Sequence, residues 1–521
     1  MLICEAEWRA YKGTTSHPLQ LLIGGPGGTG KSQIFDAVKE FFRIETSLSR
    51  LRLTAPTGVA AANIGGSTIH SEASLRVSRL GIRSERNRSS LEQRWRPVST
   101  CVVDEISFLG ANDMAQLNEY LKLAKGDVVA DTYFGGMNMI FAGDMAQLPP
   151  PMSRPLYDTY LTEQTQVNGG NDSERRALSG ITAFRSVSQA VVLKTVMRQT
   201  DSSFINLLAR LRRGLCTVAD KLLLDSYVIG SGKITDQSNL DVLHWVNEDE
   251  HASPLISYRN GVRDKHNLLM AESYARATAQ ELRMYHSRDK VGRADRQRVL
   301  TGQAAQAAWA VPPKKAGDLL GKLPLLIGMP IFCTENLATE VGISNGSEGT
   351  IAAVMYEDVS GIRYAVSADV DFPSYTGAAI DAQHPKRVVI KPTKQVFQYN
   401  LPTADASYTA TRWQLPLIPA FAYTCHNSQG RSLHRATVDL ASAAEAKDKT
   451  ALAYVMLSRV RSLEGLTILR PFPYSVISTH VSEQVRKELN RVDALALSTQ
   501  TMAKSDLWYF QRRQDHSISS G

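Results

Sequence analysis

The chain has 521 residues, of which 43% are hydrophobic and 21% are charged, and its formal net charge is +8. This length predicts two to four domains, the composition is that of a globular protein, and the positive charge suits a polyanionic partner without requiring one. No apolar run is long enough to span a membrane, the first twelve residues lack a signal-peptide layout, and five widely spaced cysteines without a Cys-x-x-Cys pair argue against structural zinc and disulfides and for a reducing compartment.

A phosphate-binding loop is predicted close to the N-terminus. The segment Gly25-Pro26-Gly27-Gly28-Thr29-Gly30-Lys31-Ser32 fits the pattern Gly-x-x-x-x-Gly-Lys-Ser, with the apolar run Leu19–Ile23 before it and a helical stretch after it. A strand, a glycine turn and a helix N-terminus together present backbone N–H groups and positive potential to an anion. Lys31 would reach the β- and γ-phosphates of a nucleoside triphosphate, and Ser32 would hold Mg²⁺. The alternative, a glycine-rich turn with a chance lysine, is disfavoured because both flanks are correct.

The first part of the chain alternates apolar runs with helical stretches, which is typical of a parallel sheet. Its predicted strands are Leu19–Ile23, Leu51–Thr54, Cys101–Val103, Met139–Ala142 and Ala190–Leu193. Three of them end in the phosphate loop, in Asp104-Glu105 and in Gly143-Asp144, so these groups should meet at the carboxyl edge of the sheet. An arginine-rich stretch at about 71–96 interrupts the pattern and is interpreted as a solvated insertion, with Arg76, Arg79, Arg83, Arg86, Arg88 and Arg94.

Two carboxylates and one amide supply the predicted hydrolytic chemistry. Hydrolysis of ATP needs one carboxylate to hold Mg²⁺ and another to deprotonate the attacking water, and adjacent residues at a strand end point in different directions. Asp104 is therefore the predicted metal ligand and Glu105 the predicted base. Gln147, in Gly143-Asp-Met-Ala-Gln-Leu-Pro-Pro150, could sense the γ-phosphate or the water, although this segment taken alone is better explained as a turn that contains a glutamine.

The second part of the chain predicts another α/β lobe, with strands at Leu255–Tyr258, Pro330–Cys333, Thr437–Leu440 and Leu466–Leu469. The stretch from Leu268 to Ala316 reads as helical, and short β-branched runs between 349 and 414 predict a small inserted β-barrel. The expected organisation is a first lobe at 1–190, a second lobe at 191–348 and 415–500, the barrel at 349–414 and a polar tail at 501–521.

Nine segments, in order, resemble the superfamily 1B DNA helicases of the petite-integration-frequency (PIF) type. They are residues 24–32, Thr54–Asn63, Ser67–His70, Asp104–Ser107, Gly143–Pro150, Met197–Gln199, Asn345-Gly346 with Gly349, Ala422–Gly430 and Tyr454–Arg459. Each could arise by accident, but nine in the family's order over roughly residues 20–470 could not.

The resemblance implies an α/β fold of two RecA-like lobes with parallel sheets, ATP at their interface and single-stranded DNA across both. It makes Arg198 and Arg459 the arginines that reach the γ-phosphate when the lobes close. Without nucleotide, these two arginines are expected to stand several ångströms too far from the phosphate site to bond a phosphate. Gln429 and Gly430 then sense the nucleotide. It also places Thr57, His70 and His426 on the DNA path, where the alternatives are a turn cap for Thr57 and structural roles for the histidines.

Two departures from the family pattern matter. The family usually has a glutamine well upstream of the loop that reads adenine, whereas only 24 residues precede Gly25 and none of them matches, since Gln20 lies inside the strand. Either adenine is read differently or the chain lacks its natural start. Asn427 and Phe108 also replace the family's common lysine and methionine, and neither change removes a catalytic group.

The predicted function is an ATP-dependent 5′-to-3′ DNA helicase that uses ATP and Mg²⁺. It would act on single-stranded DNA and on forked or structured duplex DNA, in DNA repair, recombination or telomere maintenance, in the nucleus or alternatively the mitochondrion. No protein partner is deducible from the sequence. One alternative is a catalytically idle relic of a mobile element, against which the intact site residues argue. The other is an RNA-directed helicase, against which the Asp-Glu-Ile-Ser and Gln-Leu-Pro-Pro strings argue.

Overall fold

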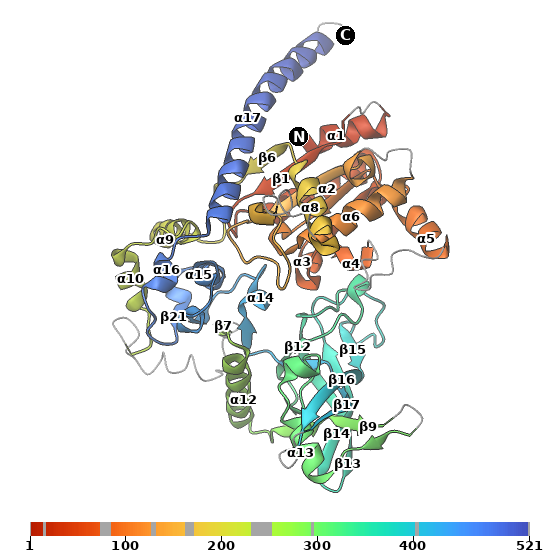
Figure 1. Ribbon diagram of the computed structural model, residues 1–521, viewed down its shortest axis with the longest axis vertical. Coiled ribbons are helices and arrows are strands. Elements are labelled where there is room, and N and C mark those ends of the chain that lie inside the picture. The colour runs from red at the N-terminus through yellow and green to blue at the C-terminus, as the bar shows by residue number, and fades with distance from the viewer. Residues whose placement is uncertain are drawn as a thin grey trace. The chain divides into compact units, whose positions relative to one another are not determined.

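The computed structural model describes residues 2–13, 17–72, 85–126, 132–161, 171–230, 253–292, 296–401 and 406–518. It contains two compact units (Figure 1). Unit 1 comprises Met1–Lys221, Glu445–Leu463 and Tyr474–Gly521, and unit 2 comprises Leu222–Ala444 and Glu464–Pro473. This division differs from the predicted lobe boundaries, because the chain returns twice to the unit that holds its N-terminal part. Within the described ranges, no helix combines the length and the apolar content of a membrane span.

A six-stranded sheet forms the centre of unit 1, and its strand order is β3-β2-β4-β5-β1-β6. The strands are β1 (Gln20–Gly24), β2 (Leu51–Ala55), β3 (Ser67–Thr68), β4 (Thr100–Val103), β5 (Asn138–Gly143) and β6 (Gln189–Val192). Every pairing is parallel, as predicted. The five predicted strands are confirmed to within two residues at each end. The two-residue strand β3 was not predicted, because it is too short to show a period.

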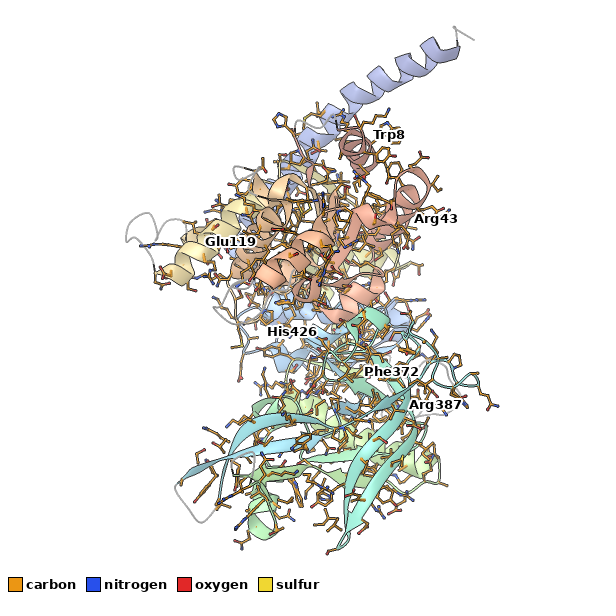
Figure 2. All side chains as sticks on the ribbon, turned by 90° about the vertical axis from the view of Figure 1, so that its right-hand side faces the viewer. Trp8, Arg43, Glu119, Phe372, Arg387 and His426 are labelled. Carbon is orange, nitrogen blue, oxygen red and sulfur yellow. The ribbon has the colours of Figure 1, made fainter. Side chains whose placement is uncertain are left out.

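Helices cover both faces of this sheet, so its strands are apolar on both sides. The nearby helices are α1 (Leu2–Tyr11), α2 (Lys31–Glu45), α6 (Ala111–Lys125), α8 (Asp172–Arg185) and α17 (Glu483–Ile518). Leu21 and Ile23 share a core with residues of α1 and α2, whereas Leu22 between them packs with residues of α6, α8 and α17. Charged side chains such as Arg43 of α2 and Glu119 of α6 point outward (Figure 2).

Unit 1 also contains α3 (Gly58–Asn63), α4 (Ile69–Glu72), α5 (Glu85–Trp95), α9 (Ser202–Arg212), α15 (Lys449–Leu457) and α16 (Ser475–Ser478), and α10 (Val218–Asp225) leads into unit 2. Arg76, Arg79 and Arg83 of the predicted insertion lie outside the described residues. The rest of that segment is not simply solvated, because α5 buries Leu91 and Trp95 in the core. The predicted polar tail is helical as far as Ile518, because it continues α17.

Unit 2 contains a four-stranded parallel sheet with strand order β19-β7-β20-β21. Its strands are β7 (Leu255–Ser257), β19 (Ala422–Thr424), β20 (Ala436–Asp439) and β21 (Leu466–Ile468). The helix α12 (Asn260–Ala277) follows β7 in the chain, and α14 (Cys425–Ser428) follows β19. Three of the four predicted strands of the second lobe belong to this sheet. The fourth, Pro330–Cys333, is a strand of a different, antiparallel sheet.

The β-rich part of unit 2 is larger than the predicted barrel at 349–414, and it is not confirmed as a closed barrel. It consists of separate sheets with orders β15-β14-β13-β12-β18, β10-β9-β17-β16 and β11-β8. The strands are β8 (Arg283–His286), β9 (Arg288–Val291), β10 (Arg298–Val299), β11 (Lys322–Leu325), β12 (Pro330–Cys333), β13 (Glu348–Val359), β14 (Ile362–Asp371), β15 (Arg387–Ile390), β16 (Thr393–Asn400), β17 (Ser407–Gln414) and β18 (Leu417–Pro419). The stretch predicted as helical therefore contains three strands, and its helices are the end of α12 and α13 (Gly302–Trp309). Inside this part, Phe372 is fully buried (Figure 2).

Candidate active site

The phosphate loop, residues 25–30, joins β1 to α2 at the carboxyl edge of the unit 1 sheet. Its backbone is held by local bonds, because the Thr29 hydroxyl donates to the Pro26 carbonyl at 2.9 Å. Gly28 must be glycine for two reasons: its φ is +83°, and a Cβ atom there would lie 2.5 Å from Cβ of Arg198. The loop therefore has the close-packed glycine turn that the sequence predicts, and it leads directly into a helix N-terminus.

Lys31 begins α2 and bends back over the loop. Its Nζ donates to the carbonyl oxygens of Gly25 at 2.9 Å and Pro26 at 3.1 Å. Burial lowers the pKa of Lys31, and nearby carboxylates oppose that effect, with Asp144 the strongest and Glu105 next. The ammonium thus lies within the loop with carboxylates around it, which is where a phosphate would be bound.

Asp104 and Glu105 follow β4, the strand two places from β1 in the sheet. Asp104 is buried, and among the described residues its Oδ1 has no hydrogen-bond partner. Burial and the charge of Glu105 raise the pKa of Asp104, while Lys31 opposes this. Glu105 has φ 48° and ψ 45°, a left-handed conformation that costs a non-glycine residue on the order of 1 kcal/mol. Adjacent carboxylates at a strand end are thus confirmed in position, and they differ in burial.

Three polar side chains from separate segments converge on Gly27. A Cβ atom at this glycine would lie 3.2 Å from Nη2 of Arg459, 3.4 Å from Nη1 of Arg198 and 3.6 Å from Nε2 of Gln147. Gln147 is buried, and its Oε1 has no hydrogen-bond partner among the described residues. Burial lowers the pKa values of both arginines, but a guanidinium stays charged at neutral pH. The loop thus faces two cationic groups and one amide.

The two arginines do not stand apart from the phosphate loop, contrary to the expectation for a nucleotide-free chain. Both belong to unit 1, because residues 445–463 pack in the same compact unit as the loop. Arg459 is 1% exposed, and its Nε donates to the Val455 carbonyl at 3.0 Å. Arg198 donates to the Ser458 carbonyl at 2.8 Å, which joins the two arginine segments. Arg459 therefore points toward the loop and not to the outer surface.

A buried cluster beside these groups was not predicted. The carboxylate of Asp144 accepts hydrogen bonds from Arg212, at 2.7 Å from Nη2, and from the Tyr454 hydroxyl at 2.8 Å. Burial alone would raise the pKa of Asp144, but Arg212 holds it below its usual value. The sequence signal available for this cluster was the position of Asp144 directly after a buried strand, together with Tyr454 in the segment that carries Arg459.

Thr57 and His70 follow β2 and β3, at the same carboxyl edge as the phosphate loop. Thr57 is the N-cap of α3, since its side-chain oxygen accepts from the Ala60 N–H at 3.2 Å. The capping alternative is thus correct for Thr57, but both side chains are also exposed. A cap uses the hydroxyl oxygen as acceptor, so its hydrogen remains able to reach a phosphate.

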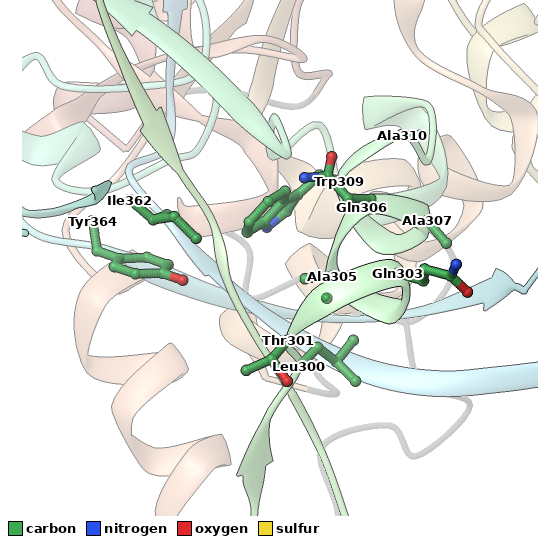
Figure 3. Close-up of a pocket in the computed structure, with 11 residues that line it drawn as sticks. Leu300, Thr301, Gln303, Ala305, Gln306, Ala307, Trp309, Ala310, Ile362 and Tyr364 are labelled. Atoms are coloured by element: carbon green, nitrogen blue, oxygen red, sulfur yellow. The ribbon is translucent and has the colours of Figure 1, made fainter. Parts of the chain in front are cut away.

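The remaining predicted residues lie in unit 2. His426 is exposed on α14 (Figure 2), Gln429 is buried just after that helix, and Gly430 has φ +81°. A cavity of about 780 Å³ in the same unit is lined mainly by apolar side chains, Leu300, Trp309, Ile362 and Tyr364 among them (Figure 3). No predicted site residue lines this cavity, so the candidate chemistry lies at the phosphate loop.

Known DNA helicases resemble the chain over most of its length. The PIF1-like helicase family matches residues 12–221. The ATP-dependent DNA helicase PIF1 of Xenopus laevis is 26% identical over 85% of this chain and 58% of its own length. The human PIF1 helicase is 25% identical over 88% of this chain and 59% of its own length, so the chain spans little more than half of these relatives.

Solved structures show the same fold. The Pif1 helicase from Bacteroides in complex with ADP-AlF3 and single-stranded DNA matches with a TM-score of 0.60 and 20% identity, over 94% of this chain and 96% of that one. The Pif1 helicase from Candida albicans matches with a TM-score of 0.59 and 21% identity, over 94% and 98%. Residues 12–221 thus match the PIF1-like helicase family, and the chain shares the α/β fold of the solved Pif1 structures.

Proposed function

We propose that this protein is an ATP-dependent DNA helicase that couples ATP hydrolysis to 5′-to-3′ movement on single-stranded DNA. One observation carries the proposal: Arg198, Arg459 and Gln147 surround Gly27 of a phosphate loop whose lysine faces carboxylates. This is the set of groups that phosphoryl transfer requires, namely a phosphate cradle, a base and cations for the transition state. The direction of movement and the action on structured duplexes rest on the motif resemblance given above, and the unwinding of forked duplexes is supported by the likeness to a structure of Pif1 helicases that unwind forked double-stranded DNA.

The residues present fit ATP and Mg²⁺. The loop N–H groups and Lys31 suit the phosphates, and the unpartnered buried Oδ1 of Asp104 suits a hard cation better than it suits an apolar core. Asp104 and Ser32 would hold Mg²⁺, which when bound neutralises charge on the phosphates. The nucleotide would be held by the loop residues Gly25, Pro26, Gly27, Gly28, Thr29, Gly30 and Lys31. Gln429 and Gly430 would sense it.

Glu105 is the proposed base. In-line attack of a water oxygen on the γ-phosphorus forms one P–O bond and breaks the bond to the β-phosphate oxygen, and the water proton passes to the Glu105 carboxylate. Gln147 orients the water or the γ-phosphate through its amide. Arg198 and Arg459 stabilise the charge that builds on the phosphoryl oxygens. The buried position of Arg459 and the half-buried position of Arg198 against Gly27 support this role, because electrostatic stabilisation is strongest where water is excluded.

Thr57, His70 and His426 are the proposed DNA contacts. The first two share the carboxyl edge of the unit 1 sheet with the nucleotide residues, so binding of a strand there and events at the phosphates act on the same set of loops. The proposed compartment is the nucleus, with the mitochondrion as the alternative, and the proposed processes are repair, recombination and telomere maintenance.

The proposal predicts that single-stranded DNA stimulates ATP turnover and that DNA affinity falls steeply with salt. Neutralising several phosphates releases counterions, which gives a log–log salt slope of roughly −0.7 per phosphate contacted. Steady-state ATPase assays with and without single-stranded DNA, and fluorescence anisotropy over a salt series, measure both effects. Single-stranded RNA of the same sequence is the control. An ATPase indifferent to DNA, or stimulated equally by RNA, would contradict the proposed substrate.

A further inference from the structure

The carboxylate of Asp144 accepts hydrogen bonds from three separate segments. Its carboxylate accepts from Arg212 at the end of α9, from the Tyr454 hydroxyl on α15, and from the Ala146 N–H in its own turn at 3.1 Å. It is 1% exposed. A buried carboxylate with donors on each side has a single favourable orientation, and therefore fixes the elements that supply the donors.

Tyr454 connects this carboxylate to the end of α15, two residues before Arg459. The Tyr454 carbonyl accepts from the Ser458 N–H at 2.9 Å, and Ser458 precedes Arg459. Arg459 in turn bonds to the carbonyl of Val455, the residue after Tyr454. The tyrosine ring is 2% exposed, and its hydroxyl also lies 3.4 Å from the Gly27 nitrogen of the phosphate loop. The Tyr454 hydroxyl thus contacts both Asp144 and the phosphate loop, about one helical turn before Arg459.

Gln147 lies in the turn that begins at Asp144. The Gln147 N–H donates to the Asp144 carbonyl at 3.0 Å, and the bond from Ala146 holds the turn between the two residues. The amide of Gln147 and the guanidinium of Arg459 therefore approach Gly27 from elements that meet at Asp144.

We infer that Tyr454 is a positioning residue, whose hydroxyl bond to Asp144 holds Arg459 at the phosphate loop for hydrolysis. The inference rests on the proposed function, since it assigns a role within that same site. The hydroxyl bonds to Asp144 and accepts from the Gly27 N–H, and its effect on hydrolysis passes through the placement of Arg459. Misplacing a catalytic group by about 1 Å costs on the order of 10²-fold in rate.

The test is Tyr454→Phe, which keeps the buried ring and leaves Asp144 its bonds from Arg212 and Ala146. The expected result is a loss of about 10- to 100-fold in kcat with a small change in KM for ATP, because Arg459 acts mainly in the transition state. Tyr474→Phe is the matched control: it also removes one hydroxyl bond in unit 1, to the carbonyl of Cys216 at 2.8 Å, and that bond involves neither the phosphate loop nor Asp144. Both variants should melt at similar temperatures, and only Tyr454→Phe should lose kcat.

A double-mutant cycle separates positioning from a general structural effect. If Tyr454 acts through Arg459, Tyr454→Phe should lower single-turnover hydrolysis in the native background but have little further effect in Arg459→Ala. The same loss in both backgrounds, or an unchanged kcat in Tyr454→Phe alone, would overturn the inference while leaving the proposed function standing. An unmodified protein without ATPase activity would instead count against the proposed function.

Discussion

Replacing Arg459 by alanine is expected to slow ATP hydrolysis on the order of 10³-fold while ATP remains bound, which is the effect of losing an arginine that stabilises phosphoryl transfer. The guanidinium approaches Gly27 and is buried, so water cannot easily supply the stabilisation that its positive charge would give. Single-turnover hydrolysis gives the rate, and equilibrium binding of a fluorescent ATP analogue gives the affinity. Stimulation by single-stranded DNA should also be lost, because nucleotide would no longer stabilise the closed site.

Arg461→Ala is the control for this experiment, because Arg461 is an exposed arginine two residues further along the same segment. It should hydrolyse ATP at close to the native rate. Arg459→Lys keeps the charge but not the planar fork of donors, and it should recover only part of the rate. If Arg459→Ala and Arg461→Ala turn over equally fast, Arg459 has no part in hydrolysis.

Lys31→Ala and Glu105→Gln should separate binding from hydrolysis. Lys31 lies within the phosphate loop, so its removal should weaken ATP binding and lower the rate together. Glu105→Gln removes the base but leaves the loop and Asp104 intact, so ATP should still bind while turnover falls by about 10²-fold or more. Isothermal titration with a slowly hydrolysed ATP analogue and steady-state ATPase assays measure the two quantities.

The control for charge is Glu119→Gln on the exposed face of α6, which should bind and hydrolyse ATP normally. An equal loss of nucleotide affinity in Lys31→Ala and Glu105→Gln would remove the assignment of Glu105 as base. It would make this carboxylate part of the binding site instead.

The sequence predicted best the parts of the fold that depend on local pattern. Apolar runs identified five strands of the unit 1 sheet, because those strands are buried on both faces and each is followed by a helical period or a glycine turn. The strands between Arg283 and Leu325 escaped notice because Ala, Gln and Arg favour a helix in isolation, whereas here tertiary pairing decides. Closure of a sheet into a barrel is likewise a matter of pairing that no local pattern encodes.

The candidate site also contains residues whose convergence the sequence predicts and residues whose convergence it does not. Lys31, Asp104 and Glu105 follow strands directly, so their convergence could be deduced from the carboxyl-edge rule for parallel sheets. The cluster of Asp144, Arg212 and Tyr454 could not, because its members are 68 and 310 positions apart and nothing local links them. The packing of Arg459 in the same unit as the loop was missed for that reason too, since sequence order suggested that it belongs to the second lobe.

The contact between Gly27 and Tyr454 joins positions 427 residues apart. During synthesis it therefore cannot form until long after the phosphate loop has been made. At roughly 5–20 residues per second, translation from Asp144 to Tyr454 takes about 15 to 60 s. During that interval the phosphate loop and both carboxylates already exist, while the segment that carries Arg459 has not been made. A nascent chain therefore has the residues proposed to hold ATP before it has the arginine proposed to speed hydrolysis, and the proposed site is complete only after residue 459 has been added and has packed in the same unit as the phosphate loop.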